Sequence, residues 1–177
     1  MTRLAPQQIS STDAQYPPIL KTRLGTETPA RITAIGSLDV LAAPLTALFC
    51  SSRCPGNAIL NAASIARNWR DEGRGVISGF HSPVEKECLR ILLRGKQPII
   101  ICPARSIDGM RIPAEWRPAI ESGRMLLLSP FPAKTRRPTT ALCEQRNQFA
   151  AALANAYYFP HARSGGHLET LAAQMDD

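Results

Sequence analysis

The sequence predicts an α/β fold with a mostly parallel sheet and helices on both faces. Short apolar runs of strand type alternate with segments of helical length along most of the chain, which indicates βαβ units. The run 97–104 contains three consecutive isoleucines, as is typical of a strand that is covered on both faces. With 177 residues, the chain is long enough for one globular domain with a sizeable core.

The first part of the chain differs in composition from the rest. Residues 1–45 are rich in Pro, Ala and Thr, and we expect them to form an N-terminal arm with one short strand, residues 30–36, packed on the core. Residues 46–177 are predicted to form the main α/β domain, so that the chain is a single globular domain overall.

The main domain is predicted to contain five strands, each followed by a helix. The expected strands are 45–52, 75–80, 97–104, 124–131 and 156–162. The expected helices are 56–73, 82–95, 114–123, 141–155 and 166–175. Apolar residues at helical spacing indicate the first helix, and Gly73 is well placed to end it. The second helix has start signals in Ser82, Pro83 and Glu85, namely a serine N-cap, a proline and an acid.

Composition narrows the class of function. The net charge of +7 favours a polyanionic partner such as nucleic acid or a nucleotide. The five cysteines form no CxxC pair and no zinc spacing, so we predict no metal site and no disulfide framework. We find no apolar run long enough to span a bilayer and no signal peptide, and we expect a cytoplasmic protein. No cofactor is predicted.

Ligands of parallel α/β sheets bind beyond the carboxyl ends of the strands, so the turns at those ends are the candidate sites. The turn after residue 50 offers Ser51, Ser52 and Arg53, which suit an anionic oxygen, although an ordinary serine-capped turn has the same pattern. The next turn offers Gly79 and His81, and we assign His81 no catalytic role because it has no companion nucleophile or acid.

Two later turns carry more positive charge. A proline-bounded loop holds Lys134, Arg136 and Arg137, and Arg146 and Asn147 follow on the next helix. These cations are a candidate track for a phosphate backbone or simply a solvated charge run. The last turn, Arg163, Ser164, Gly165 and Gly166, precedes a helix whose N–H groups are positioned for an anion, and its glycines allow a ligand close to the main chain.

Several common enzyme signatures are absent from the sequence. There is no GxxxxGK[ST] and no GxGxxG after the first strand, which argues against a P-loop NTPase and a standard dinucleotide-binding fold. No pair of carboxylates and no Ser-His-Asp set stands out, and the three histidines are scattered. We therefore expect a binding protein and not an enzyme.

Taken in order, these segments resemble the Rossmann-like domain of the DNA-processing protein A (DprA/Smf) family, within the SLOG superfamily. "LFCSSR" is similar to the family's "xxVGSR", and "LLLSPFP" to "xxLSEFP". "QRNQFAAALA" is similar to "RRNRIIAGLS", and "ARSGGHLET" to "xRSGSLITA". The resemblance runs from Tyr16 to about Thr170, with "HSPVE" standing where the family has "ARGID".

The resemblance implies a bacterial protein that binds single-stranded DNA in a basic pocket, forms a homodimer and hands the DNA to a RecA-type recombinase during natural transformation. It also implies that Arg53, Arg146, Asn147 and residues 163–166 form the phosphate or DNA pocket. Ser52 and Gly79 are further candidates beside them, and Lys134, Arg136 and Arg137 would widen the basic track. The alternative is a SLOG-type nucleotide-ligand sensor or a protein similar to nucleoside-phosphate phosphoribohydrolases, whose motif "PGGxGTxxE" has the counterpart "SGGHLET" here.

Overall fold

The computed structural model describes residues 4–176 and contains a seven-stranded sheet in the order β1-β2-β6-β5-β4-β3-β7. The strands are β1 (Gln7–Ser10), β2 (Arg31–Gly36), β3 (Leu45–Leu48), β4 (Gly75–Ser78), β5 (Ile99–Ile101), β6 (Met125–Ser129) and β7 (Ala156–Tyr158). The five strands from β6 to β7 are parallel, whereas β1 and β2 run antiparallel to their neighbours. The predicted mostly parallel sheet is confirmed.

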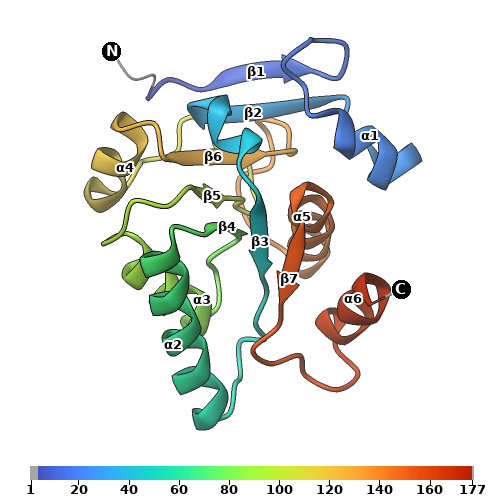
Figure 1. The fold of residues 1–177 in the computed structure, drawn as a ribbon. Helices are drawn as coiled ribbons and strands as arrows, with labels where there is room; N and C mark the ends of the chain where they lie inside the picture. Colours follow the sequence, from blue (N-terminus) through green and yellow to red (C-terminus); the bar gives the residue numbers. More distant parts are fainter. Residues whose placement is uncertain (1–3, 177) are drawn as a thin grey trace.

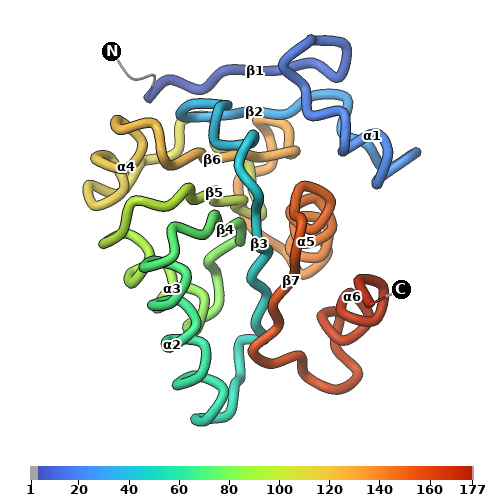
Figure 2. The backbone as a smooth tube through the Cα atoms, in the orientation of Figure 1, coloured from blue at the N-terminus to red at the C-terminus, as the bar shows by residue number. Residues whose placement is uncertain are grey.

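Helices cover both faces of this sheet, as predicted. They are α1 (Pro18–Leu24), α2 (Gly56–Glu72), α3 (Pro83–Leu92), α4 (Arg117–Glu121), α5 (Thr140–Leu153) and α6 (His167–Met175). Short 3-10 turns are η1 (Gly25–Glu27), η2 (Leu38–Ala42) and η3 (Ala114–Trp116). Figures 1 and 2 show α2, α3 and α4 on one side of the sheet and α1, α5 and α6 on the other. None of the helices within residues 4–176 is long and apolar enough to cross a membrane.

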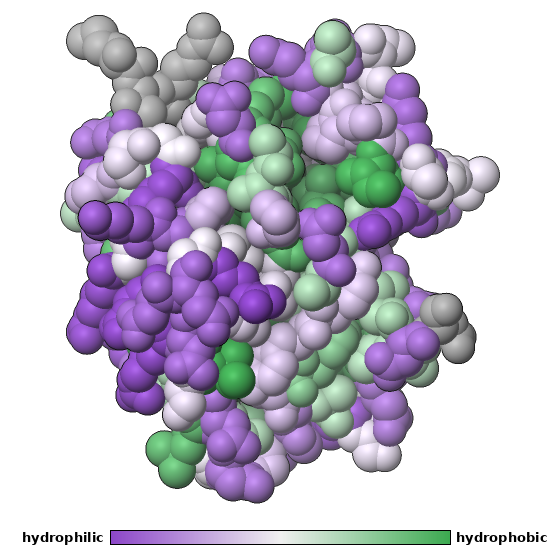
Figure 3. Space-filling model, viewed as in Figure 1, coloured by the Kyte–Doolittle hydropathy of each residue, from purple (hydrophilic) through white to green (hydrophobic). Residues whose placement is uncertain are grey.

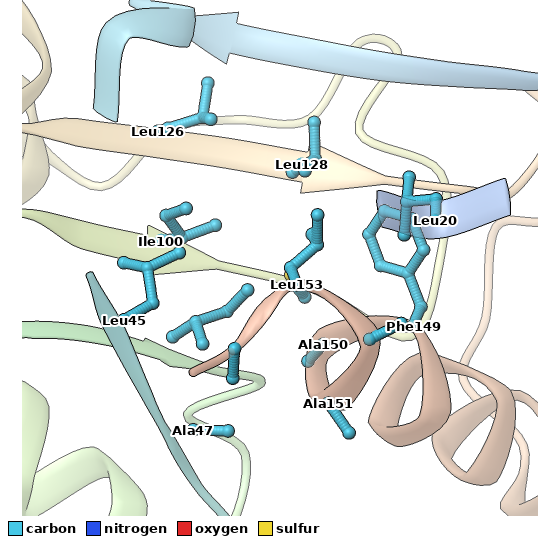
Figure 4. Packing of buried hydrophobic residues seen from close by; sticks show 14 of the residues in the cluster. Leu20, Leu45, Ala47, Ile100, Leu126, Leu128, Phe149, Ala150, Ala151 and Leu153 are labelled. Carbon is cyan, nitrogen blue, oxygen red and sulfur yellow. The ribbon is translucent and has the colours of Figure 1, made fainter. Parts of the chain in front are cut away.

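The sheet separates two hydrophobic cores, and the isoleucines of β5 supply both of them. Ile99 and Ile101 join the core beneath α2, α3 and α4, whereas Ile100 joins the core beneath α1 and α5. This alternation follows from the two-residue period of a strand, and full burial of each side chain contributes about 2 to 3 kcal/mol. Figure 4 shows the second core, in which Leu20 of α1 lies beside Phe149 of α5.

Local signals in the sequence set several of the helix ends. Ser82 and Glu85 form the predicted capping box at the start of α3, with the Ser82 side chain accepting from the Glu85 N–H. Gly73 ends α2 in the left-handed conformation, at φ 74°. Thr139 caps α5 by accepting the N–H of Leu142.

Residues before 45 contain more structure than the one short strand that the sequence indicated. The expected strand is β2, but β1 pairs with it and α1 follows, so the segment extends the sheet as its antiparallel edge. Long-range contacts hold these elements: Tyr16 donates to the carbonyl of Pro29 at 2.6 Å, and the side chain of Leu20 is fully buried. Neither contact is visible in the sequence pattern of residues 7–24.

Candidate functional site

A cavity of about 780 Å³ opens at the carboxyl ends of β3, β4 and β7. Its walls come from the turn after β3, the start of α3, the start of α5 and the loop between β7 and α6. This is the edge at which the sequence analysis placed the ligand site. Three helices begin at the cavity, and the first N–H groups of a helix attract anions when they are free.

The turn after β3 forms one wall and is tied to the loop after β7. The Ser51 hydroxyl accepts the N–H of Arg163 at 2.9 Å, and the N–H of Ser51 donates to the carbonyl of His161 at 3.0 Å. Ser52 and Arg53 both line the cavity and are exposed. Among the described residues Arg53 has no acidic partner, so its guanidinium is available to a ligand.

Arg146 of α5 lies in the cavity wall but is almost entirely buried, with 4% of its surface exposed. Its Nε donates to the side-chain oxygen of Asn147 at 2.7 Å, and its Nη1 donates to the carbonyl of Cys102 at 3.0 Å. A Cβ atom on Gly79 would stand 1.8 Å from that Nη1. Gly79 was a candidate for phosphate contact, but the structure shows that it leaves room for the guanidinium.

The loop from Arg163 to Gly166 closes largely on itself. Gly165 adopts φ 72°, and its N–H donates to the carboxylate of Glu169 at 2.7 Å. The N–H of Gly166 donates to the carbonyl of Arg163 at 3.0 Å. Arg163 and Gly166 line the cavity, whereas Ser164 and Gly165 do not.

Donors that remain at this end of the cavity come from the first turn of α6. His167 and Leu168 both line the cavity, and a helix has no acceptor of its own for N–H groups in its first turn. The glycine loop therefore positions these two N–H groups and Arg163. The N–H groups of Gly165 and Gly166 are not available to a ligand, because they donate within the loop and to Glu169.

The N–H groups at the start of α3 already bind a carboxylate of the protein itself, that of Glu85. The carboxylate of Glu85, only 6% exposed, accepts the N–H groups of Cys50 at 2.8 Å, His81 at 2.8 Å and Ser82 at 3.1 Å. It thereby joins the end of β3 to the start of α3. Glu85 was predicted from the sequence as part of a capping box, but no sequence signal placed it at the cavity. Because its oxygens occupy these donors, an external anion has to bind elsewhere.

Glu144 and His167 stand opposite each other across the remaining wall. The Nδ1 atom of His167 lies 4.0 Å from a carboxylate oxygen of Glu144, and both residues line the cavity. Nε2 of His167 is buried and has no hydrogen-bond partner in the part of the chain that the structure describes. In total the lining holds three arginines against two glutamates, and one of these glutamates, Glu85, already accepts three backbone N–H groups.

The cations of the loop between β6 and α5 lie outside the cavity. Lys134, Arg136 and Arg137 are exposed and do not line it, although Pro138 and Thr139 of the same segment do. Arg136 is partly engaged, because its Nη1 donates to the carbonyl of Asp108 at 3.1 Å. These cations therefore directly precede, in the sequence, the residues that line the cavity at the start of α5.

Two thiols, Cys50 and Cys143, line the cavity, and burial suppresses the reactivity of Cys50. Burial, with smaller contributions from Cys54 and Glu85, raises the pKa of the Cys50 thiol to about 12. The thiol is therefore protonated at neutral pH and is a poor nucleophile. Within residues 4–176 no group of three His, Cys, Asp or Glu residues is arranged to hold a metal ion.

The family model of DNA recombination-mediator protein A matches residues 7–176, which covers the whole sheet and the cavity. The chain belongs to this family. The resemblance that the sequence motifs indicated is thus confirmed. No curated protein matches the chain.

Two solved structures share the fold of this DNA recombination-mediator protein A family member. DNA processing protein A from Streptococcus pneumoniae matches with a TM-score of 0.74 and 19% identity, over 96% of this chain and 59% of that protein. The Helicobacter pylori protein matches with a TM-score of 0.71 and 19% identity, over 98% of this chain and 77% of that one. Its description concerns the single-stranded DNA binding mode of DNA processing protein A. The present chain therefore spans less than two thirds of the pneumococcal protein.

Proposed function

We propose that this chain binds single-stranded DNA at the carboxyl-edge cavity and acts in DNA recombination or natural transformation. The observation that carries the proposal is the convergence of Arg53, Arg146 and Arg163 with the free first turn of α6 on one cavity. Guanidinium groups and helix N-termini are the donors that phosphate groups prefer in proteins. Family membership and the DNA-binding relative from Helicobacter pylori support the same reading.

Each donor has a distinct role in this proposal. Arg53 and Arg163 are exposed and approach phosphates from the two loops that Ser51 ties together. Arg146 is fixed by its bonds to Asn147 and Cys102, so the two N–H bonds of Nη2 and the second one of Nη1 are left for a phosphate. Because Arg146 does not have to be ordered when a ligand binds, its contact loses little conformational entropy.

The exposed cations beside the mouth extend the binding surface. Lys134, Arg136 and Arg137 would meet the part of the strand that leaves the cavity over the start of α5. Contacts of this kind carry no sequence information, so we expect binding to any sequence with a strong dependence on salt.

Binding without catalysis is part of the proposal. The one buried carboxylate of the lining, Glu85, accepts three backbone N–H groups and is not free to act as a base. The Cys50 thiol, whose pKa is raised to about 12 by burial, is not a nucleophile at neutral pH.

Three wider roles follow from family membership and are also proposals. They are transfer of the DNA to a RecA-type recombinase, function as a homodimer, and a cytoplasmic location. The five free cysteines support the last of these, because free thiols are typical of a reducing compartment.

A small-nucleotide sensor of SLOG type is the second candidate. The cavity volume of about 780 Å³ lies within the range of small-ligand pockets and favours it. Both candidates use the same phosphate chemistry, so length and sequence dependence have to separate them. A sensor saturates with one mononucleotide and depends on the base, whereas a DNA-binding protein gains affinity with strand length.

The test is fluorescence anisotropy with labelled oligothymidylate at two salt concentrations, for the wild type and for an Arg53→Gln, Arg163→Gln double variant. Loss of two phosphate contacts should reduce the slope of log affinity against log salt by about 1.4. A Lys21→Gln, Arg31→Gln variant is the matched control, because both residues are exposed and neither lines the cavity. A folded wild type that binds no oligonucleotide at low salt, or that binds one mononucleotide with base selectivity, would contradict the DNA-binding proposal.

A further inference from the structure

Three cations lie on the solvent side of helix α3 and just beyond its end, and we call them the α3 cation stripe: Lys86 and Arg90 on the helix, and Arg94 two residues after its last residue. All three are exposed, whereas Val84, Cys88 and Leu92 are buried on the opposite side of the helix. Lys86 and Arg90 are four residues apart on the helix, so they lie on one face, about 6 Å apart along the axis at 1.5 Å per residue. Arg94 follows in the turn after the helix, where its N–H donates to the carbonyl of Ile91 at 3.2 Å. Figure 3 shows hydrophilic side chains gathered over the flank where α2, α3 and α4 lie.

The stripe starts one helical turn from the cavity. His81 and Ser82, which lead into α3, line the cavity, and the N–H of Lys86 donates to the carbonyl of Ser82 at 2.9 Å. A single-stranded nucleic acid that leaves the cavity past His81 therefore meets Lys86 next. The stripe leads in a different direction from the Lys134 to Arg137 loop, because that loop precedes α5 on the other face of the sheet.

Charge balance within the stripe leaves two cations unpaired. Arg90 pairs with Glu87 on the preceding turn. Lys86 and Arg94 have no acidic partner among residues 4–176. A polyanion can therefore bind both of them without breaking an ion pair.

The stability of the helix does not explain these two positions. Lys86 lies in the first turn of α3, where the helix dipole disfavours a positive charge. Arg94 follows the helix end, but the carbonyl groups there already have donors. Arg124 donates to Leu93 at 2.7 Å, and the Gln97 side chain donates to Leu92 at 2.5 Å.

We propose that the α3 cation stripe binds the phosphates of the same single-stranded nucleic acid beyond the part held in the cavity. The proposal rests on the proposed function, because it needs the strand to enter the cavity first. The stripe then adds affinity only for strands that are long enough to reach it. An acidic protein partner would use the same charges, but the start of the stripe at the cavity wall favours the strand.

The experiment compares two oligothymidylates, one of about 5 nucleotides, near the lower end of the usual site sizes of single-strand binding modules, and one of about 20 nucleotides, above their upper end. For a Lys86→Gln, Arg94→Gln variant we expect unchanged binding of the short probe. For the long probe we expect the salt slope to fall by about 1.4 through the loss of two phosphate contacts. Between 50 and 200 mM salt, the wild type should then lose about sevenfold more affinity than the variant does.

A Glu87→Gln variant tests the proposal in the opposite direction. It frees Arg90 from its partner and removes one negative charge beside the stripe, so long-probe affinity should increase about two- to threefold while short-probe affinity stays unchanged. The Lys21→Gln, Arg31→Gln variant again controls for net charge, since these residues lie on α1 and β2. It should leave the long-probe salt slope within error of the wild type.

Other outcomes would contradict the stripe proposal, the proposed function, or both. If the wild type binds the short probe but the stripe variant binds the long probe with an unchanged slope, the stripe proposal fails and the proposed function stands. If the stripe variant loses both probes equally while circular dichroism shows a native fold, the residues belong to the cavity site and not to an extension of it. If the wild type binds neither probe, both proposals fail.

Discussion

Gly79 and Arg146 are coupled by space: a Cβ atom on Gly79 would lie 1.8 Å from Nη1 of Arg146 and 2.2 Å from its Cζ. The glycine follows the last residue of β4, and the arginine lies on α5, which covers one face of the sheet (Figure 1). Since the same Nη1 donates to the carbonyl of Cys102, the glycine determines whether that bond can form. One missing methyl group thus positions a buried cation in the cavity wall.

Substitution of Gly79 by alanine should displace the Arg146 guanidinium. We expect a loss of about 1 to 3 kcal/mol in the free energy of unfolding, from overpacking and from the broken hydrogen bond to Cys102. Urea unfolding measures this loss. In an Arg146→Ala background the same Gly79→Ala change should cost much less, because its obstacle is gone. Equal costs in the two backgrounds would show that the two residues are not coupled.

Replacement of Glu85 by glutamine should destabilise the junction of β3 and α3. The carboxylate accepts from Cys50, His81 and Ser82, and a glutamine amide has only one oxygen to serve these donors. We expect a loss of about 2 to 3 kcal/mol, measured by urea unfolding followed by circular dichroism. The Glu87→Gln change on the same helix, where the side chain is 45% exposed, is the control and should cost under about 1 kcal/mol. Similar midpoints for both variants would contradict the structural role of Glu85.

Removal of the charge of Glu144 should strengthen anion binding. This carboxylate lines the cavity and is 45% exposed in its side chain, so it repels phosphate through partly screened electrostatics. For Glu144→Gln we expect about threefold tighter binding of oligothymidylate at low salt, and a smaller gain at higher salt. Anisotropy titrations measure both. Glu27→Gln in η1, outside the cavity, should leave the affinity unchanged, and an equal gain there would attribute the effect to net charge alone.

Much of the fold was predictable because its signals are local. The Ser82, Pro83 and Glu85 start of α3 and the buried isoleucines of β5 are determined by neighbouring residues, and the structure confirms both. β1 and α1 were missed because their stability comes from distant contacts. Arg23 of α1, for example, donates to the carbonyl of Ala152 at 3.3 Å. No pattern within residues 7–24 reveals such a partner.

The sheet edge at which the cavity lies was predictable, but the hydrogen-bonding state of the donors around it was not. Topology alone brings Arg53 and Arg163 to one sheet edge, and both line the cavity. The use of the Gly165 N–H by Glu169 depends on side-chain geometry, although the spacing of four residues is the signal that could have indicated it. The burial of Arg146 depends on Gly79 and Cys102, which are 67 and 44 residues away in sequence.

Alkaline pH should destabilise the protein through its buried thiols. Burial raises the pKa of Cys102 from 9.0 to about 12, against a smaller opposing effect of Arg146. The folded state therefore keeps this proton while the unfolded state loses it, so the stabilising contribution is complete below pH 9 and is lost as pH rises through about 12. One such thiol changes the free energy of unfolding by at most about 1.4 kcal/mol per pH unit.

Urea unfolding at pH 8, 9 and 10 measures this decline, and a Cys102→Ala variant isolates the contribution of one thiol. The variant should start from a lower stability because of the cavity it creates, and should then decline less steeply above pH 9. Cys143→Ala is the control, because this half-buried thiol on α5 lies at the cavity and not in the core. Parallel curves for the wild type and Cys102→Ala would show that the Cys102 thiol ionises as readily in the folded state as in the unfolded one. The titration of other groups would then have to explain any alkaline decline.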